Sequence, residues 1–110
     1  MREPGLTTEA AKQVVAEKCV FPKVTENSIK DHIKAARYLA DGSTTICILE
    51  MYNGFKVIGH STPADIRNFN EEVGRRFAFD NAFRQLWQLE GYLLRDKLWS
   101  NQGQSYQGGL

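Results

Sequence analysis

The hydrophobic pattern of this chain is strongest between Asn68 and Trp99, where aromatic and aliphatic residues recur at steps of three and four. Such steps place side chains on one face of a helix, so the pattern predicts one long helical segment. Asn68 is a candidate N-cap, with Glu71 as its capping-box partner. From Leu86 onward the apolar positions run almost all the way round, which predicts a helix covered on more than one side. Gly91 either divides the segment or lets a neighbour approach closely.

Two β-rich runs form the clearest local signal, Thr44–Tyr52 and Phe55–Ser61. The dipeptide Asn53-Gly54 separates them, and it supplies the two positive-φ residues that a type I′ turn needs. The sequence therefore predicts a β-hairpin with a two-residue loop.

A two-residue loop also sets the register of this hairpin, because it places Tyr52 opposite Phe55 and Leu49 opposite Ile58. In that register one face of the hairpin carries four apolar residues, Cys47, Leu49, Met51 and Ile58. A lone hairpin is marginally stable in water, so we expect it to pack on the long helix or to gain strands from a partner.

Weaker helical patterns precede the hairpin. One covers residues 7–19 and stops before Pro22, which donates no amide hydrogen and restricts the residue before it. The second covers residues 25–41 and stops at Gly42. Its inward face is predicted to hold Ile29, Ile33, Ala36, Leu39 and Ala40. Residues 62–65 fit a capped single helical turn that leads into the long helix.

These patterns predict an α+β domain over residues 1–100, with a central β-hairpin that a partner can extend, two N-terminal helices and a long C-terminal helical segment. Residues 101–110 form a Gln/Gly-rich tail. A chain of 110 residues is long enough for one domain, and 42% hydrophobic with 25% charged residues is an ordinary globular balance.

Charge and cysteine content narrow the function classes. The net charge is +1, so electrostatics give no case for a nucleic acid or a membrane surface as partner. No apolar run approaches the roughly 20 residues of a membrane span. Cys19 and Cys47 have no paired spacing and no signal-peptide pattern precedes them, so we interpret them as reduced cytosolic thiols.

The residues give little support for an enzyme. His32 and His60 fall in different predicted elements, where we interpret them as surface residues, and neither has a metal-ligand spacing. We find no Ser-His-Asp or Cys-His arrangement, no glycine-rich phosphate loop and no HExxH motif. We therefore predict no catalytic residue, no metal site and no cofactor.

The sequence gives more support for a binding site than for a catalytic one. Phe55 follows the tight turn, where its ring could stack on a base. Arg75, Arg76 and Arg84 project from the long helix and could pair with phosphate oxygens bidentately. With Asn68 at the predicted helix start, these form the candidate ligand site. Phe55 also fits a core position, and the arginines also fit a solvated face that pairs with acidic residues of the first turn. Aromatics interleaved with arginines suit a nucleotide pocket and a protein interface equally well.

Several motifs of this chain resemble one family of small tailed-phage proteins, the gene-49/gene-66 product family, which has no assigned function. The resemblance rests on Thr44–Leu49, Asn53–Ser61, Asn68–Arg75, Leu86–Trp87 and Leu89–Arg95. The chain departs from the family at His60-Ser61-Thr62-Pro63, where relatives tend to carry an acidic residue and then Ser-Ala-Cys.

The resemblance implies a phage accessory protein, expressed in the host bacterial cytoplasm, that acts on the host and does not build the virion. The predicted architecture is also similar to the Thoeris anti-defence sponges. We therefore expect a non-catalytic binder that sequesters a small anionic nucleotide-type immune signal. The alternative is a protein–protein inhibitor of a host or defence enzyme. A nucleic-acid accessory factor comes third, because the +1 charge argues against it.

We also predict a homo-oligomer, at least a dimer, assembled through the long helix and the hairpin edge. One hairpin and two alanine-rich helices cannot cover an apolar helix on every side, and a large exposed apolar patch is unusual on a soluble monomer. The unpaired outer edges of a two-stranded sheet also invite strand pairing across a two-fold axis.

Overall fold

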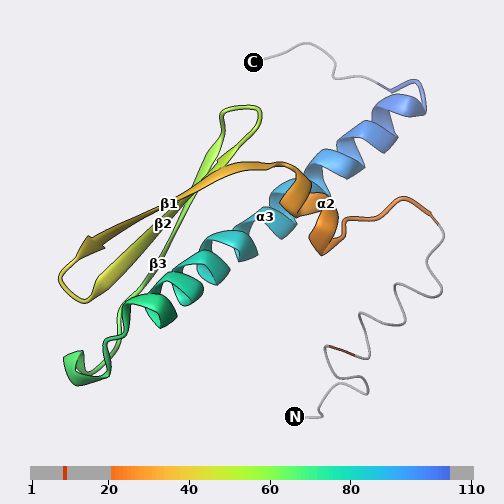
Figure 1. The fold of residues 1–110 in the computed structure, drawn as a ribbon. Helices are drawn as coiled ribbons and strands as arrows, with labels where there is room; N and C mark the ends of the chain where they lie inside the picture. The colour runs from red at the N-terminus through yellow and green to blue at the C-terminus, as the bar shows by residue number, and fades with distance from the viewer. Residues whose placement is uncertain (1–8, 10–20, 105–110) are drawn as a thin grey trace.

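A three-stranded antiparallel sheet packed against one long helix forms the fold (Figure 1). The computed structural model describes Glu9 and residues 21–104. In chain order the elements are α2 (Glu26–Asp31), β1 (Ile33–Asp41), β2 (Thr44–Met51), β3 (Lys56–Ser61), the 3-10 helix η1 (Ile66–Asn68) and α3 (Glu71–Asn101). The α+β class and the long C-terminal helix are confirmed. Apart from Glu9, the predicted helix over residues 7–19 lies outside the described residues, as does most of the predicted tail.

The second predicted helix is wrong beyond its first turns. Helix α2 has six residues, with Thr25 and Ser28 forming its capping box, and the chain then continues as strand β1. The predicted helix stop is a two-residue turn between β1 and β2, in which Gly42 has a φ of 59°. That is the position at which a type II′ hairpin turn needs positive φ. Pairing with β2 along the whole strand outweighs the helix propensity of this alanine-rich segment.

The β2–β3 hairpin is confirmed, but its predicted turn and register are wrong. Only Gly54 has positive φ, at 91°, so Asn53 does not take the type I′ conformation. The loop has three residues, closed by hydrogen bonds from Gly54 N–H to Met51 C=O (2.9 Å) and from Met51 N–H to Phe55 C=O (2.8 Å). This is the pattern of a type I turn followed by a glycine bulge.

The extra loop residue reverses the two faces of β3. Leu49 pairs with Val57, and Ile58 pairs with Ile48. Val57 is therefore buried with Leu49, while Ile58 is 57% exposed on the opposite face. The predicted inward face was right for the β2 residues and wrong for Ile58, because a shift of one residue exchanges the sides of a strand.

Helix α3 begins two residues later than predicted and has no break. Its N-cap is Asn70, whose side chain accepts a hydrogen bond from Val73 N–H at 3.0 Å. Asn68 instead ends η1, which Asp65 caps and which lies one turn after the predicted single helical turn. The helix continues through Gly91, where a Cβ atom added to the glycine would meet no described atom within 4 Å beyond its own stretch of helix. Neither predicted role of Gly91 is therefore found.

The core lies between α3 and the inner face of the sheet. Its buried hydrophobic residues are Ile29, Cys47, Leu49, Met51, Val57, Ala78, Ala82, Phe83 and Leu86. The closest approach is at Gly59 of β3, which lies directly against the backbone of Ala78 and Ala82. Because neither side presents a bulky side chain there, helix and strand can touch through their main chains.

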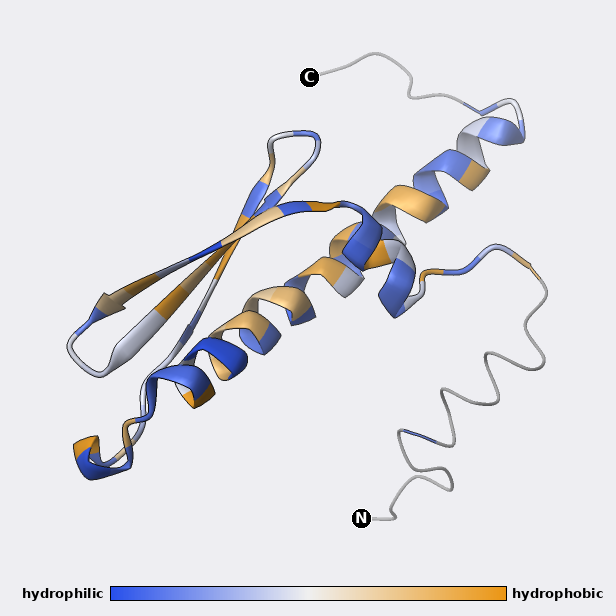
Figure 2. Cartoon of the chain, viewed as in Figure 1, coloured by the Kyte–Doolittle hydropathy of each residue, from blue (hydrophilic) through white to orange (hydrophobic). Residues whose placement is uncertain are grey.

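Helix α3 is longer than the sheet it covers. At 1.5 Å per residue its 31 residues span about 46 Å, whereas the eight residues of β2 span about 27 Å. The C-terminal part of the helix therefore extends past the strands (Figure 1). Apolar residues continue into this part, interleaved with hydrophilic ones (Figure 2), and Leu89, Tyr92 and Leu93 remain exposed there.

Helix α3 packs on β2 and β3 and leaves most of β1 uncovered. Ala36, Tyr38 and Ala40 pair with Leu49, Cys47 and Thr45, and they share the helix-facing side of the sheet with these residues. The β2 residues are buried, but their β1 neighbours are exposed. We call this exposed part of β1, Ala36, Tyr38 and Ala40, the open strip.

Candidate functional site

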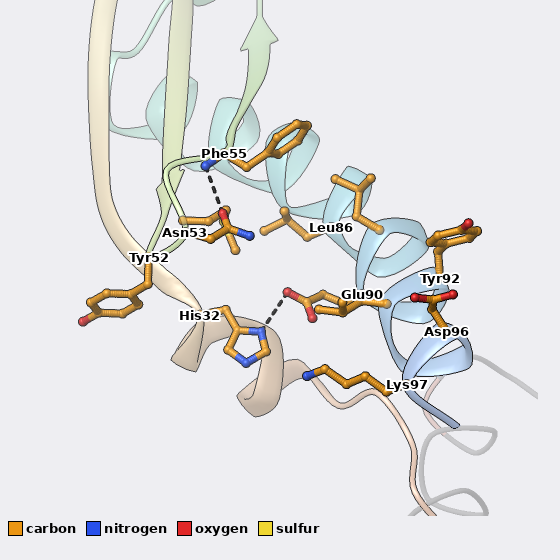
Figure 3. A pocket seen from close by; sticks show the side chains of 12 residues that line it. His32, Tyr52, Asn53, Phe55, Leu86, Glu90, Tyr92, Asp96 and Lys97 are labelled. Carbon is orange, nitrogen blue, oxygen red and sulfur yellow. Dashed lines mark hydrogen bonds and ion pairs between the residues drawn. The ribbon is translucent and has the colours of Figure 1, made fainter. Parts of the chain in front are cut away.

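One concave site lies between the β2–β3 turn, the end of α2 and the C-terminal half of α3 (Figure 3). We call it the groove. Its volume is about 420 Å³, within the range of small-molecule and peptide pockets. The lining residues are His32, Met51, Tyr52, Asn53, Phe55, Leu86, Leu89, Glu90, Tyr92, Leu93, Asp96 and Lys97.

The groove has an apolar base and a polar rim. Met51 and Leu86 belong to the buried core, so the base is fixed by the packing of α3 on β2. Phe55 is held at the turn, where its N–H donates to Asn53 Oδ1 at 2.9 Å. Phe55 is 55% exposed, so most of its ring is available to an occupant.

One side-chain hydrogen bond closes the α2 side of the groove. His32 Nδ1 lies 2.8 Å from Glu90 Oε1, which joins the C-cap of α2 to the middle of α3. The His32 side chain is half exposed, which agrees with the surface position predicted from the sequence. Its partner is 58 positions away, so no local pattern could have indicated the pair. Asp96 and Lys97 add one charge of each sign, so the lining holds two carboxylates, with Glu90, and one lysine.

A second, more basic surface lies near the start of α3, beside the open strip. The Arg75 guanidinium carbon is 5.8 Å from the centroid of the Tyr38 ring, within the range of a cation–π contact. Burial is the main cause that raises the pKa of Tyr38, and the positive charges of both Arg75 and Arg76 oppose that rise. Both arginines therefore act on the same phenol. We call Tyr38, Arg75 and Arg76 the arginine–tyrosine surface.

Each arginine of this surface also pairs with a carboxylate one helical turn away. Arg75 Nη2 lies 2.6 Å from Glu71 Oε1, and Arg76 Nε lies 3.2 Å from Asp80 Oδ2. The two arginine side chains are 53% and 73% exposed. Exposed pairs of this kind contribute about 0.3–0.5 kcal/mol each, so an incoming anion can replace the carboxylates at little cost.

Comparison with known proteins identifies the family. The family described as "Phage protein (N4 Gp49/phage Sf6 gene 66) family" matches residues 24–98, about two-thirds of the chain. The chain belongs to this phage protein family. The resemblance inferred from the motifs is thus confirmed, and the protein is a phage accessory protein. No curated protein and no solved structure matches it.

The groove and the arginine–tyrosine surface both lie within the segment that defines this phage family. In the described part of the chain, no helix is both long enough and apolar enough to cross a membrane. The same residues contain no group of three His, Cys, Asp or Glu side chains that could hold a metal ion.

The five predicted site residues do not converge in this phage protein. Phe55 lines the groove, whereas Arg75 and Arg76 lie near the other end of the sheet, at least 10 positions before the first groove residue of α3. That separation is about 15 Å along the helix axis. Arg84 is exposed on α3 and does not line the groove, and Asn68 lies in η1.

Sequence reasoning missed Tyr38, which is the aromatic partner that the structure gives to Arg75. It was missed because residues 33–41 were assigned to a helix. The usable signal was the Asp41-Gly42-Ser43 turn directly before a β-rich run, which is also typical of a hairpin.

Proposed function

We propose that this phage accessory protein acts by non-catalytic binding and sequesters a nucleotide-type signal of the infected cell. The observation that supports this best is the arginine–tyrosine surface, where the exposed Arg75 guanidinium lies by the Tyr38 ring and the exposed Arg76 follows it on the helix. A nucleotide needs both kinds of partner, cations for its phosphates and an aromatic or polar side chain for its base or sugar.

The chemistry of the two arginines fits phosphate. A guanidinium presents a planar fork of N–H donors that can bind two phosphate oxygens at once. Two such forks on one helix can each bind a phosphate group. Tyr38 is 37% exposed, so its ring edge and hydroxyl can contact the rest of the ligand while Arg75 covers one ring face.

The groove supports a second function, inhibition of a host or defence enzyme through a protein–protein contact. Three exposed aromatic side chains border it, Tyr52, Phe55 and Tyr92, and aromatic residues of this kind are enriched at interaction hot spots. Glu90 and Asp96 disfavour a phosphate at this site, whereas an apolar or aromatic side chain of a partner fits its base.

Isothermal titration calorimetry distinguishes these functions. The probes are a panel of nucleoside mono- and diphosphates and cyclic dinucleotides, titrated into the full chain. We expect one or more probes to bind the wild type, and the double variant Arg75→Ala/Arg76→Ala to bind them at least tenfold more weakly. The matched control is Arg84→Ala/Arg95→Ala, which removes the same charge from other positions of the same helix and should bind within about twofold of wild type.

Three results would overturn the proposal. Either no probe binds the wild type, or both double variants lose affinity equally, or Phe55→Ala weakens binding of the probes while Arg75→Ala/Arg76→Ala does not. The last result would move the site to the groove.

A further inference from the structure

The two edge strands of the sheet, β1 and β3, differ in whether other side chains cover their main-chain groups. On β3, the edge is covered by amide side chains of α3. His60 N–H donates to Asn81 Oδ1 at 3.1 Å, and Gln85 Nε2 donates to Ile58 C=O at 2.7 Å. Both strand residues direct their main chain away from β2. At these two positions the hydrogen-bonding groups of the edge are therefore occupied by α3.

The edge of β1 has no such cover in the described part of the chain. In an antiparallel ladder, alternate residues direct both main-chain groups to the same side. The hydrogen bonds that Met51 makes with Phe55 and Gly54 fix this alternation, which directs the groups of Arg37, Leu39 and Asp41 towards β2. The N–H and C=O groups of the open strip therefore point away from β2, beyond the edge of the sheet.

This edge is well suited to pair with another strand. It belongs to a nine-residue strand that contains no proline, and its bulge lies at the far end, between Ile33 and Ala35. Native proteins usually protect a long edge with proline, a bulge or a covering element, because an open edge is a template for strand pairing.

We propose that β1 pairs antiparallel with β1 of a second copy about a two-fold axis, which joins two sheets into one of six strands. The charges of β1 favour a register with Leu39 on the axis. Arg37 and Asp41 lie two positions on either side of Leu39, so the rotation places Arg37 opposite the partner subunit's Asp41, twice.

This register agrees with the hydrogen-bonding groups of the edge. It pairs Tyr38 with the partner's Ala40, and both residues direct their main-chain groups outward. A register centred on Arg37 would instead oppose two like charges. The charges and the main-chain groups of this edge are thus complementary to those of a second copy, which favours a second copy over an unrelated strand as the partner.

Pairing also covers apolar surface on the outer face of the sheet. Leu39 is 56% exposed there, and it would meet its own copy across the axis. Helix α3 does not obstruct the contact, because it packs on β2 and β3. Both copies of the arginine–tyrosine surface would then lie on the same face of the joined sheet, on either side of the axis. The pairing itself does not depend on the proposed ligand.

Cysteine cross-linking tests the pairing in the full chain with Cys19→Ser as background. Leu39→Cys would meet its copy at a non-hydrogen-bonded position, where Cα atoms lie about 4.5 Å apart, within disulfide range. Ile58→Cys is the control, because Ile58 has nearly the same exposure on the same face but lies on β3. We expect mild oxidation to convert most of the Leu39→Cys protein to a covalent dimer and little of the Ile58→Cys protein.

The uncross-linked wild type should have twice the 12.5 kDa chain mass by light scattering at micromolar concentration. Ala40→Pro removes one outward N–H and leaves the β1–β2 hydrogen bonds in place, so it should fold, by circular dichroism, and be a monomer. A wild-type mass of 12.5 kDa, equal cross-linking of the two cysteine variants, or a folded Ala40→Pro dimer would each overturn the pairing. A wild-type protein that is a dimer but binds none of the nucleotide probes would contradict the proposed function and leave the pairing intact.

Discussion

The contact between Gly59 and α3 determines how closely the helix packs on the sheet, and Gly59→Ala tests it. A Cβ atom at this position would lie 2.3 Å from Ala82 N, 2.4 Å from Ala78 O and 2.8 Å from Ala82 Cα. All three atoms belong to the helix main chain, so no change of rotamer relieves the overlap. The helix and β3 must separate by about 1 Å before ordinary van der Waals distances are restored.

That separation would loosen the whole interface. Leu49 and Leu86 are completely or almost completely buried between the sheet and α3, and their contacts would lengthen with the same movement. Overpacking a core typically costs about 1–3 kcal/mol. Because backbone atoms are involved on both sides, we expect a loss near the upper end, about 3 kcal/mol in the free energy of unfolding. For a domain of this size the melting temperature should fall by roughly 12–24 °C.

Gly91→Ala is the matched control for this experiment. It makes the same chemical change in the interior of α3, where the new Cβ meets none of the described atoms within 4 Å except those of its own stretch of helix. Alanine has the higher helix propensity, so this variant should be more stable than wild type by up to about 1 kcal/mol. Urea denaturation followed by circular dichroism measures both variants. A Gly59→Ala protein as stable as Gly91→Ala would refute the close contact between β3 and α3.

Three further outcomes are expected. Gly54→Val should cost about 1–3 kcal/mol of stability, because a β-branched residue resists the φ of 91° found there, and a melting curve like that of wild type would contradict the turn assignment. His60→Ala should leave the effect of the protein in infected cells largely intact. If a folded His60→Ala variant loses that effect, the proposal that the protein only binds its ligand is contradicted. A hydrogen bond from Arg37 is the main cause that lowers the pKa of Glu50. The stabilisation by this bond is therefore fully present above the ordinary glutamate pKa, and it is lost as the pH falls through the lowered pKa. Arg37→Ala should therefore destabilise the protein at neutral pH and have less effect in strong acid, and equal losses at both in urea denaturation would contradict this coupling.

The sequence predicted the elements whose hydrophobic period was unambiguous. The β2 and β3 runs and the long helix were found because alternation and steps of three and four differ clearly. The hairpin register was not found, because Asn53-Gly54 fits two turn types that differ in the sign of φ at Asn53. In the structure the Asn53 side chain instead accepts the Phe55 N–H, a local contact that the dipeptide alone does not specify.

The sequence did not predict strand β1 or the part of Tyr38 in the arginine–tyrosine surface, and both were missed for the same reason. Residues 33–41 are rich in alanine and fit a helical period, and only pairing with β2 makes them a strand. Arg75 and Arg76 were identified from their positions on α3, but Tyr38 approaches them from an element that was assigned incorrectly. The groove joins residues between positions 32 and 97, so its shape depends on the tertiary arrangement of three segments.

Native mass spectrometry of the protein purified from infected cells tests the proposed sequestration most directly. Wild-type protein should carry a bound small anion of nucleotide mass, and Arg75→Ala/Arg76→Ala purified in parallel should lack it. The Arg84→Ala/Arg95→Ala control should retain the anion. A wild-type protein that carries no small anion, or one that carries a host polypeptide in its place, would contradict the proposal that this phage protein sequesters a nucleotide-type signal.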